Sequence, residues 1–582
     1  MKPASTLFRI AASALLVGLL AACGTAVDHQ ESGLAGTSPQ PAGISPVRQE
    51  GDSGDEPQGR MSGLASELKS KEFGSAVAPS PEVTLTSLSA DMGMRRKRLA
   101  EYDAIRLPSA GVERENYAHI EQNGVSSVAE QPVSTFSIDV DTGAYALVRR
   151  FLNQGQLPPK DAVRTEELIN YFHYDHPQPR EGGRPFSLMT EVGPTPWNAD
   201  SLLVQVGIQG LVPQRGRRPA GNLVFLVDVS GSMQDPDKLP LLKSAFKLLV
   251  KQLNASDRVS LVVYAGASGV VLEPTPGDQR ARILAALERL TAGGSTHGSA
   301  GIELAYAMAE QARIEGGINR VILATDGDFN VGTVNHERLM DLIEEKRKQG
   351  VTLTTLGFGR GNYNDRLMEQ LADRGDGNYA YIDTLNEARK VLVDELGATL
   401  EVIAKDVKVQ IEWNPALVAE YRLIGYENRL LAREDFTNDK VDAGEIGAGH
   451  SVTALYEIVL ADSRGRRLPV LRYGKVPEAA GKAEEIAYLR LRYKRPDGDR
   501  SLEIGRPIAR RAIHRALADT SDNFRFGAAV AAFAELLRGG RYTGNYDYTQ
   551  VAGLARGARG DDVSGHRGEF LRLVDLAAGF GG

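Results

Sequence analysis

Cysteine is almost absent from this chain, in which Cys23 is the only one among 582 residues. A single thiol excludes an internal disulfide, and no spacing of histidines and cysteines suits a zinc site. An excess of positive charge is lacking too, because 68 Lys and Arg stand against 75 Asp and Glu, for a net charge of -7. That balance argues against nucleic-acid binding, and no P-loop or dinucleotide fingerprint indicates a nucleotide.

The chain also lacks a strong membrane-spanning signal at its N-terminus. The apolar run "AASALLVGLLAAC" follows Lys2 and Arg9 and is too short to cross a bilayer, so we interpret residues 1–22 as a secretory signal peptide. The sequence Leu20-Ala21-Ala22-Cys23 resembles the bacterial lipobox, which implies that Cys23 is lipidated and becomes the mature N-terminus. Gly24 follows in place of an Asp, which favours the outer membrane. The resemblance implies a lipid-anchored protein of the bacterial cell envelope, facing the periplasm or the surface; a plain signal peptide with an incidental cysteine is the alternative.

Composition divides the rest of the chain, which is too long for one hydrophobic core. Residues 23–128 are rich in Gly, Ser, Pro and charge, and we expect a disordered, flexible tether there. Beyond it we predict four folded regions. They are an α+β region at 129–219, an α/β domain at 220–398, a β-rich domain at 399–505 and a helical region at 506–582.

The α/β domain opens on "NLVFLVDVSGSM", an apolar run that ends in Asp228 and is followed by Ser230 and Ser232. Strands and helices alternate from here on, which predicts a doubly wound, mainly parallel sheet. Thr296 lies on a glycine-rich loop, and Asp326 ends another apolar strand. Ligands of such sheets bind beyond the carboxyl ends of the strands, and an all-oxygen set of two carboxylates and three hydroxyls suits Mg²⁺.

These motifs resemble the metal-ion-dependent adhesion site of von Willebrand factor A (VWA) domains. The match consists of Asp228-x-Ser230-x-Ser232, then Thr296, then Thr325-Asp326-Gly327. The resemblance implies that Asp228, Ser230, Ser232, Thr296 and Asp326 hold Mg²⁺, or Mn²⁺ or Ca²⁺, directly or through water. It also implies that an acidic side chain of a protein partner completes the coordination of the ion.

Segments outside that domain resemble bacterial YfbK-type VWA lipoproteins, among them "STFSIDVDTGAYALVRRFLNQGQLPP", "PTPWN" and "YTGNYDYTQVAGLARGARGDDVSGHRGEFLRLV". Strand-like runs lie on both sides of the VWA segment, at Phe186–Gly210 and from Asp406 onward. Two isolated strands are rarely stable. We therefore predict that these runs pair in one β-sandwich-like domain with the VWA domain inserted.

Three functions remain open from the sequence. We expect a non-enzymatic module that binds a protein partner through a divalent cation, because no nucleophile or general base is obvious near the site. The second function is a metal-dependent hydrolase of the envelope, in which His297 or Asp328 activates water. If the protein is a binding module, the same two residues could contact the partner. Both residues also fit ordinary loop positions without a functional role. In the third, the ion only stabilises a structural lipoprotein. Asp139 and Asp141, in "DVDTGAY", suggest either a second cation loop or a simple helix start.

Overall fold

The computed structural model describes residues 115–180, 183–212, 218–294, 298–327, 333–469, 472–473 and 484–580. All of them fall within one compact unit that spans 99–582. The signal peptide, Cys23 and the tether up to residue 114 lie outside the described residues. In the described part of the chain, no helix is both long and apolar enough to cross a membrane.

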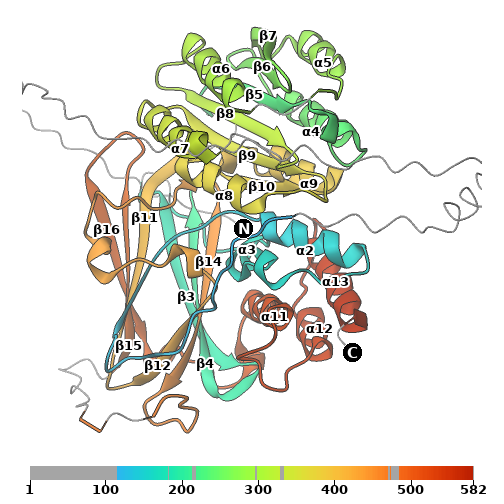
Figure 1. Ribbon diagram of the computed structural model, residues 1–582. Coiled ribbons are helices and arrows are strands. Elements are labelled where there is room, and N and C mark those ends of the chain that lie inside the picture. The colour runs from blue at the N-terminus through green and yellow to red at the C-terminus, as the bar shows by residue number, and fades with distance from the viewer. Residues whose placement is uncertain are drawn as a thin grey trace, which may run out of the picture. The chain divides into compact units, whose positions relative to one another are not determined.

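The α/β domain has the predicted doubly wound sheet, with strand order β10-β9-β8-β5-β6-β7 (Figure 1). Neighbouring strands are parallel except at the β7 edge, which is antiparallel. The strands are β5 (Gly221–Asp228), β6 (Arg258–Tyr264), β7 (Ser268–Pro276), β8 (Ile318–Thr325), β9 (Thr352–Phe358) and β10 (Tyr379–Ile382). Every residue of β5 is buried, as expected for a central strand covered on both faces.

Helices cover both faces of this sheet and divide its side chains into two cores. One core contains apolar residues of α4, α5 and α9, and the other contains those of α6, α7 and α8. The helices are α4 (Leu239–Val250), α5 (Arg280–Glu288), α6 (Gly298–Gln311), α7 (Thr333–Lys348), α8 (Asp365–Arg374) and α9 (Leu385–Arg389). Since β5 and β8 are adjacent while their following helices lie on opposite faces, their carboxyl ends border the topological switch point.

The predicted sandwich is confirmed, and the α/β domain is inserted into it. One sheet has the order β1-β12-β14-β4-β3, in which β4 precedes the insertion and its partner β14 follows it. The other has the order β13-β11-β15-β16, with β2 also paired to β11. The first sheet comprises β1 (Ser126–Ser127), β3 (Phe186–Thr195), β4 (Asn198–Gly210), β12 (Val418–Ile424) and β14 (Ser451–Leu460). The second comprises β2 (Val133–Ser137), β11 (Val402–Trp413), β13 (Ile446–Gly447), β15 (Glu485–Lys494) and β16 (Ser501–Ala509). Apolar side chains of both sheets share one core.

Helices from the two ends of the described chain form a further core. It joins α2 (Gly143–Asn153) and α3 (Thr165–Asn170) to α11 (Asp522–Leu537), α12 (Tyr548–Gly557) and α13 (His566–Phe580), as Figure 1 shows. The C-terminal part is therefore helical, as predicted. Its helices complete a core begun by N-terminal helices, which the sequence alone did not indicate.

The described fold begins earlier than the predicted tether boundary at residue 128. Ser126 and Ser127 pair with β12, Asn116 bridges to Asn364, and Glu115 forms an ion pair with Arg150. The polar composition of this segment resembles that of a flexible linker, but its contacts are made with partners elsewhere in the chain. Residues 115–128 therefore belong to the folded part of the chain.

Candidate functional site

Asp228, the last residue of β5, lies at the centre of the predicted site and is fully buried. Its Oδ1 accepts a hydrogen bond of 2.8 Å from the backbone N–H of Ser230. Its Oδ2 accepts from the hydroxyls of Thr325, at 2.9 Å, and Tyr264, at 3.2 Å. Because Thr325 ends β8 and Tyr264 ends β6, the carboxyl ends of three adjacent strands hold one carboxylate.

Burial raises the pKa of Asp228 to about 6, because removal from water disfavours the charged form. The hydrogen bonds from Ser230 and Thr325 oppose this shift, and the negative charge of Asp326 adds to it. A cation at this position would remove part of the penalty, since it would supply the positive charge that the buried carboxylate lacks.

The two predicted serines lie together in the turn that follows β5. Ser230 is almost fully buried, and its Oγ lies 3.0 Å from the Oγ of Ser232. Ser232 belongs to a short 3-10 helix, η2 (Gly231–Gln234), which Ser230 precedes. The backbone N–H of Gly231 donates to the carbonyl of Gly294, so this turn is attached to the glycine-rich loop that leads to Thr296.

Asp326 directly follows β8 and is fully buried. Gly327 comes next with a φ of +82°, in the left-handed region, and its backbone N–H donates to the Thr325 hydroxyl. A Cβ at Gly327 would lie 2.5 Å from the backbone nitrogen of Asn364, so only glycine fits here. Each residue of the motif Thr325-Asp326-Gly327 thus has a separate role. Thr325 donates a hydrogen bond to Asp228, Asp326 supplies a buried carboxylate, and Gly327 allows the turn.

Lys238 is part of this site and was not predicted from the sequence. Its Nζ lies 2.9 Å from Oδ2 of Asp326, and its side chain is only 4% exposed. The residue directly precedes α4, where a lysine in "DPDKLP" resembles an ordinary solvent-exposed charge. No signal in the sequence distinguishes it, because the contact depends on how β8 and α4 are placed in the fold.

The described part of the predicted site fits a divalent cation by its chemistry. Asp228, Ser230, Ser232 and Asp326 supply only oxygen donors at one end of the sheet, and the two carboxylates are buried. Hard oxygen donors of this kind suit Mg²⁺ better than zinc or copper. Thr296, His297 and Asp328 lie outside the described residues, so their assignment as ligand or partner contacts stays a prediction.

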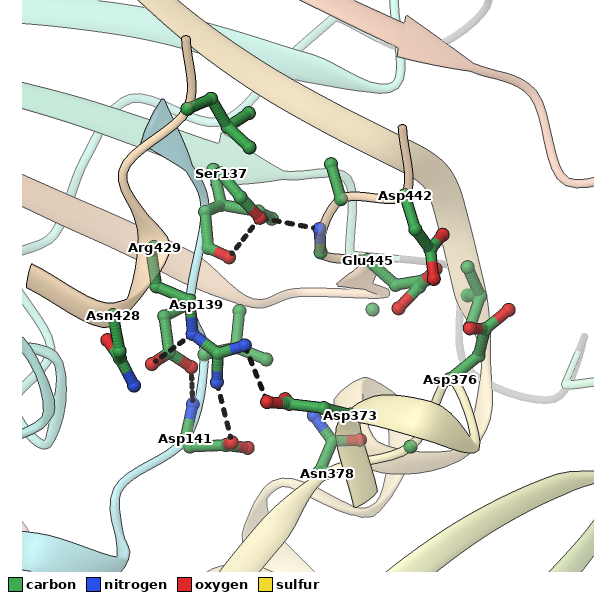
Figure 2. A pocket seen from close by; sticks show the side chains of 18 of the residues that line it. Ser137, Asp139, Asp141, Asp373, Asp376, Asn378, Asn428, Arg429, Asp442 and Glu445 are labelled. Atoms are coloured by element: carbon green, nitrogen blue, oxygen red, sulfur yellow. Dashed lines mark hydrogen bonds and ion pairs between the residues drawn. The ribbon is translucent and has the colours of Figure 1, made fainter. Parts of the chain in front are cut away.

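A second group of acidic residues lines a cavity of about 200 Å³ (Figure 2). Asp376, Asp442 and Glu445 each place one carboxylate oxygen within 4.8 Å of the others. Arg347 lies 2.6 Å from Asp376 and also pairs with Asp442. Burial raises the pKa of Asp376 to about 6 and that of Glu445 well above its usual range. An arginine already serves as counter-ion for two of the three acids.

Asp139 and Asp141 line the same cavity, and their contacts decide between the two interpretations of "DVDTGAY". Asp139 accepts from the backbone N–H of Asp141 and from Nε of Arg429, at 2.9 and 3.2 Å. Asp141 accepts from the backbone N–H of Tyr379, the first residue of β10, at 2.8 Å. Asp139 therefore joins the segment between β2 and α2 to Arg429 of the sandwich, and Asp141 joins it to β10 of the α/β domain. Both carboxylates have protein partners, and α2 begins directly after Thr142, as the helix-start interpretation predicts.

Three family models match the chain along nearly all of its described length. Residues 222–394 match the model of the von Willebrand factor type A domain, and 398–580 match one described as "Uncharacterized protein YfbK, C-terminal". Residues 111–205 match a model described as "von Willebrand factor". The inserted α/β domain and the parts around it are thus recognised separately.

Among known proteins, YfbK of Escherichia coli K12 is 46% identical over 490 residues, which is 83% of this chain and 84% of that protein. The magnesium-chelatase 60 kDa subunit of Rhodobacter capsulatus is 37% identical over 120 residues, covering 20% of this chain and 21% of that subunit. A solved von Willebrand factor type A structure from Catenulispora acidiphila has a TM-score of 0.39 and 16% identity, and the match covers 67% of this chain and 90% of that one.

Proposed function

Since the chain belongs to the YfbK family and contains a VWA domain, we propose that it binds a protein partner through a divalent cation. The observation that carries this proposal is the burial of Asp228 and Asp326 side by side with two serine hydroxyls at the switch point of the sheet. Asp228, Ser230, Ser232 and Asp326 would hold the ion together with Thr296. When bound, the ion would supply an electrophilic position for an acidic side chain of the partner.

The protein's own residues orient the site before any ion arrives. Thr325, Tyr264 and the Ser230 N–H fix the Asp228 carboxylate from three directions. Preorganised oxygen donors reduce the cost of ordering when an ion binds. We propose Mg²⁺ as the ion, with Mn²⁺ or Ca²⁺ as alternatives, and binding in place of catalysis.

We also propose that the lipid on Cys23 anchors the protein in the bacterial cell envelope, with the outer membrane favoured. The lipobox-like sequence Leu20-Ala21-Ala22-Cys23 supports this assignment. The folded part of the chain would then present the cation site to partners in the periplasm or at the surface.

The test compares thermal melting of wild type and Asp326→Ala in EDTA and in Mg²⁺ or Mn²⁺. An ion that binds only the folded state raises the melting temperature by mass action. We expect an upward shift in wild type, no shift in Asp326→Ala, and an unchanged shift in Asp235→Asn, which alters an exposed acid nearby. The change in melting temperature on adding the ion is the informative quantity, and the absolute melting temperature is not. Asp326→Ala also leaves the Lys238 ammonium buried without this carboxylate, which lowers stability by itself.

Partner binding needs a second measurement on the same proteins. We expect a partner to be recovered from envelope extracts on the immobilised chain in Mg²⁺ and lost both in EDTA and with Asp326→Ala. If melting depends on the ion while recovery does not, the ion only stabilises the fold and the binding proposal is wrong.

A further inference from the structure

The side chain of Lys238, beside the cation site, packs closely against the backbone of Gly359. The Lys238 side chain passes Gly359, the residue after β9, where a Cβ would lie 2.3 Å from both Cγ and Cε of the lysine. Gly359 has a φ of +73°, and its carbonyl accepts from the hydroxyl of Tyr381 and, at 3.4 Å, from Arg150. The loop is thus held in a position that leaves space for a lysine stem and directs the ammonium at Asp326.

Simple charge counting shows what this ammonium does to the site. Among the described residues that meet here, Asp228 and Asp326 contribute two negative charges and Lys238 one positive charge. With a divalent ion the sum is about +1, whereas without the lysine it would be zero. The nearby Asp237 and Arg360, at 3.8 Å, add no net charge. The lysine therefore opposes the cation and favours an anion.

We propose that Lys238 is a specificity-determining residue of the cation site, which weakens binding of the ion alone and strengthens binding of the acidic group that follows. This inference rests on the proposed function. The buried position of the ammonium makes the effect strong, because a charge pair 4% exposed or less is poorly screened by water and salt. Lys238 thus shifts the two affinities in opposite directions: the ion alone binds less tightly, and the acid that joins a bound ion binds more tightly.

The coupling between the ion and the acid is reciprocal by thermodynamic necessity. An acid raises the affinity of the ion by the same factor by which the ion raises the affinity of the acid. A site with this property binds its ion less tightly in the absence of an acidic partner than in its presence.

The test measures Mn²⁺ affinity by titration calorimetry and by electron paramagnetic resonance of free Mn²⁺. The full chain, purified in detergent, is compared with Lys238→Met and Lys238→Gln, first in sodium chloride and then in sodium acetate at equal ionic strength. We expect both variants to bind Mn²⁺ about tenfold or more tightly than wild type in chloride. We expect acetate to tighten Mn²⁺ binding in wild type more than in either variant.

Lys247→Met is the matched control, because it removes the same charge from α4, the helix that Lys238 directly precedes, at a position where Lys247 pairs with exposed Glu288. Lys238→Gln keeps a hydrogen-bond donor near Asp326 and covers the case in which Lys238→Met fails to fold. If wild type binds Mn²⁺ and the Lys238 variants bind it equally or less tightly, the inference is wrong while the cation site stands. If no protein binds Mn²⁺, both the cation site and the inference are wrong. Tighter binding in Lys247→Met as well would assign the effect to net charge and overturn the role of Lys238.

Discussion

Alanine at Gly359 should disturb the cation site without changing any charge. Its Cβ would lie 2.3 Å from Cγ and Cε of Lys238 and 2.7 Å from Cδ, so the lysine stem has to move. The stem has little freedom to do so, because its side chain is buried and its ammonium is paired with Asp326. We expect the ion pair to weaken and the affinity for Mn²⁺ to rise toward that of Lys238→Gln.

The cost in stability has two parts that a neighbouring glycine separates. A non-glycine residue in the left-handed region costs about 1–2 kcal/mol, and crowding a packed site adds about 1–3 kcal/mol. Gly361 lies in the same loop with a φ of +92°, but a Cβ there would meet nothing within 4 Å. Gly361→Ala should therefore show only the first part, whereas Gly359→Ala should show both.

Urea unfolding and Mn²⁺ titration of the two alanine variants supply the comparison. Gly359→Ala should lose about 2–5 kcal/mol in the free energy of unfolding and gain affinity for Mn²⁺. Gly361→Ala should lose about 1–2 kcal/mol and bind Mn²⁺ like wild type. Equal losses in the two variants, or equal Mn²⁺ affinities, would refute the idea that this loop positions Lys238.

Two further predictions concern stability. Arg164 joins α3 to α8 through Glu167, Asp365 at 2.5 Å and Glu369 at 3.7 Å, all buried. Arg164→Met should lower the free energy of unfolding, measured in urea, by about 3–5 kcal/mol. Arg374→Met, which breaks the more exposed pair with Glu344, should lower it by less than about 1 kcal/mol. Similar losses in the two variants would argue against a structural role for the buried network. Burial lowers the pKa of His176 to about 4. The unfolded chain therefore binds a proton at this histidine near pH 6.5, whereas the folded chain binds it only near pH 4. The free energy of unfolding consequently falls as the pH is lowered from 6.5 toward 4. His176→Asn should reduce the loss in the free energy of unfolding between pH 7 and pH 4.5 by about 2 kcal/mol. His514→Asn, at a more exposed histidine, is the control. An unchanged pH dependence in His176→Asn would show that His176 is not the responsible group.

The architecture was predictable where one pattern carries an unambiguous physical meaning. The apolar run before Asp228 indicates a strand buried on both faces, and strand-like runs on each side of the α/β domain indicate an insertion. The β7 edge was not predicted, because Ser268–Pro276 is half-buried, contains irregular pairing and is bounded by glycine and proline. Edge strands lack the strong pattern that burial on two faces imposes.

The site divides in the same way. Asp228, Ser230, Ser232 and Asp326 lie at or directly after strand ends, so the sequence alone places them at the same edge of the sheet. Lys238 and Arg164 are charges near helix starts, and their burial depends on partners elsewhere in the fold. Sequence patterns assign such residues to the surface, since a charge is rarely buried unless it is paired.

The insertion of the α/β domain also fixes the order in which this chain is able to fold. Gln209 of β4 faces Ser451 of β14, so the sheet closes only after the whole inserted domain has been synthesised. Until then the β3–β4 hairpin presents one unpaired edge of β4, which is a template for wrong pairing. The inserted domain makes its own contacts within a much shorter stretch of chain and is free to fold first. If it folds first, it brings the two halves of the sandwich together and shortens the time during which the edge of β4 stays unpaired.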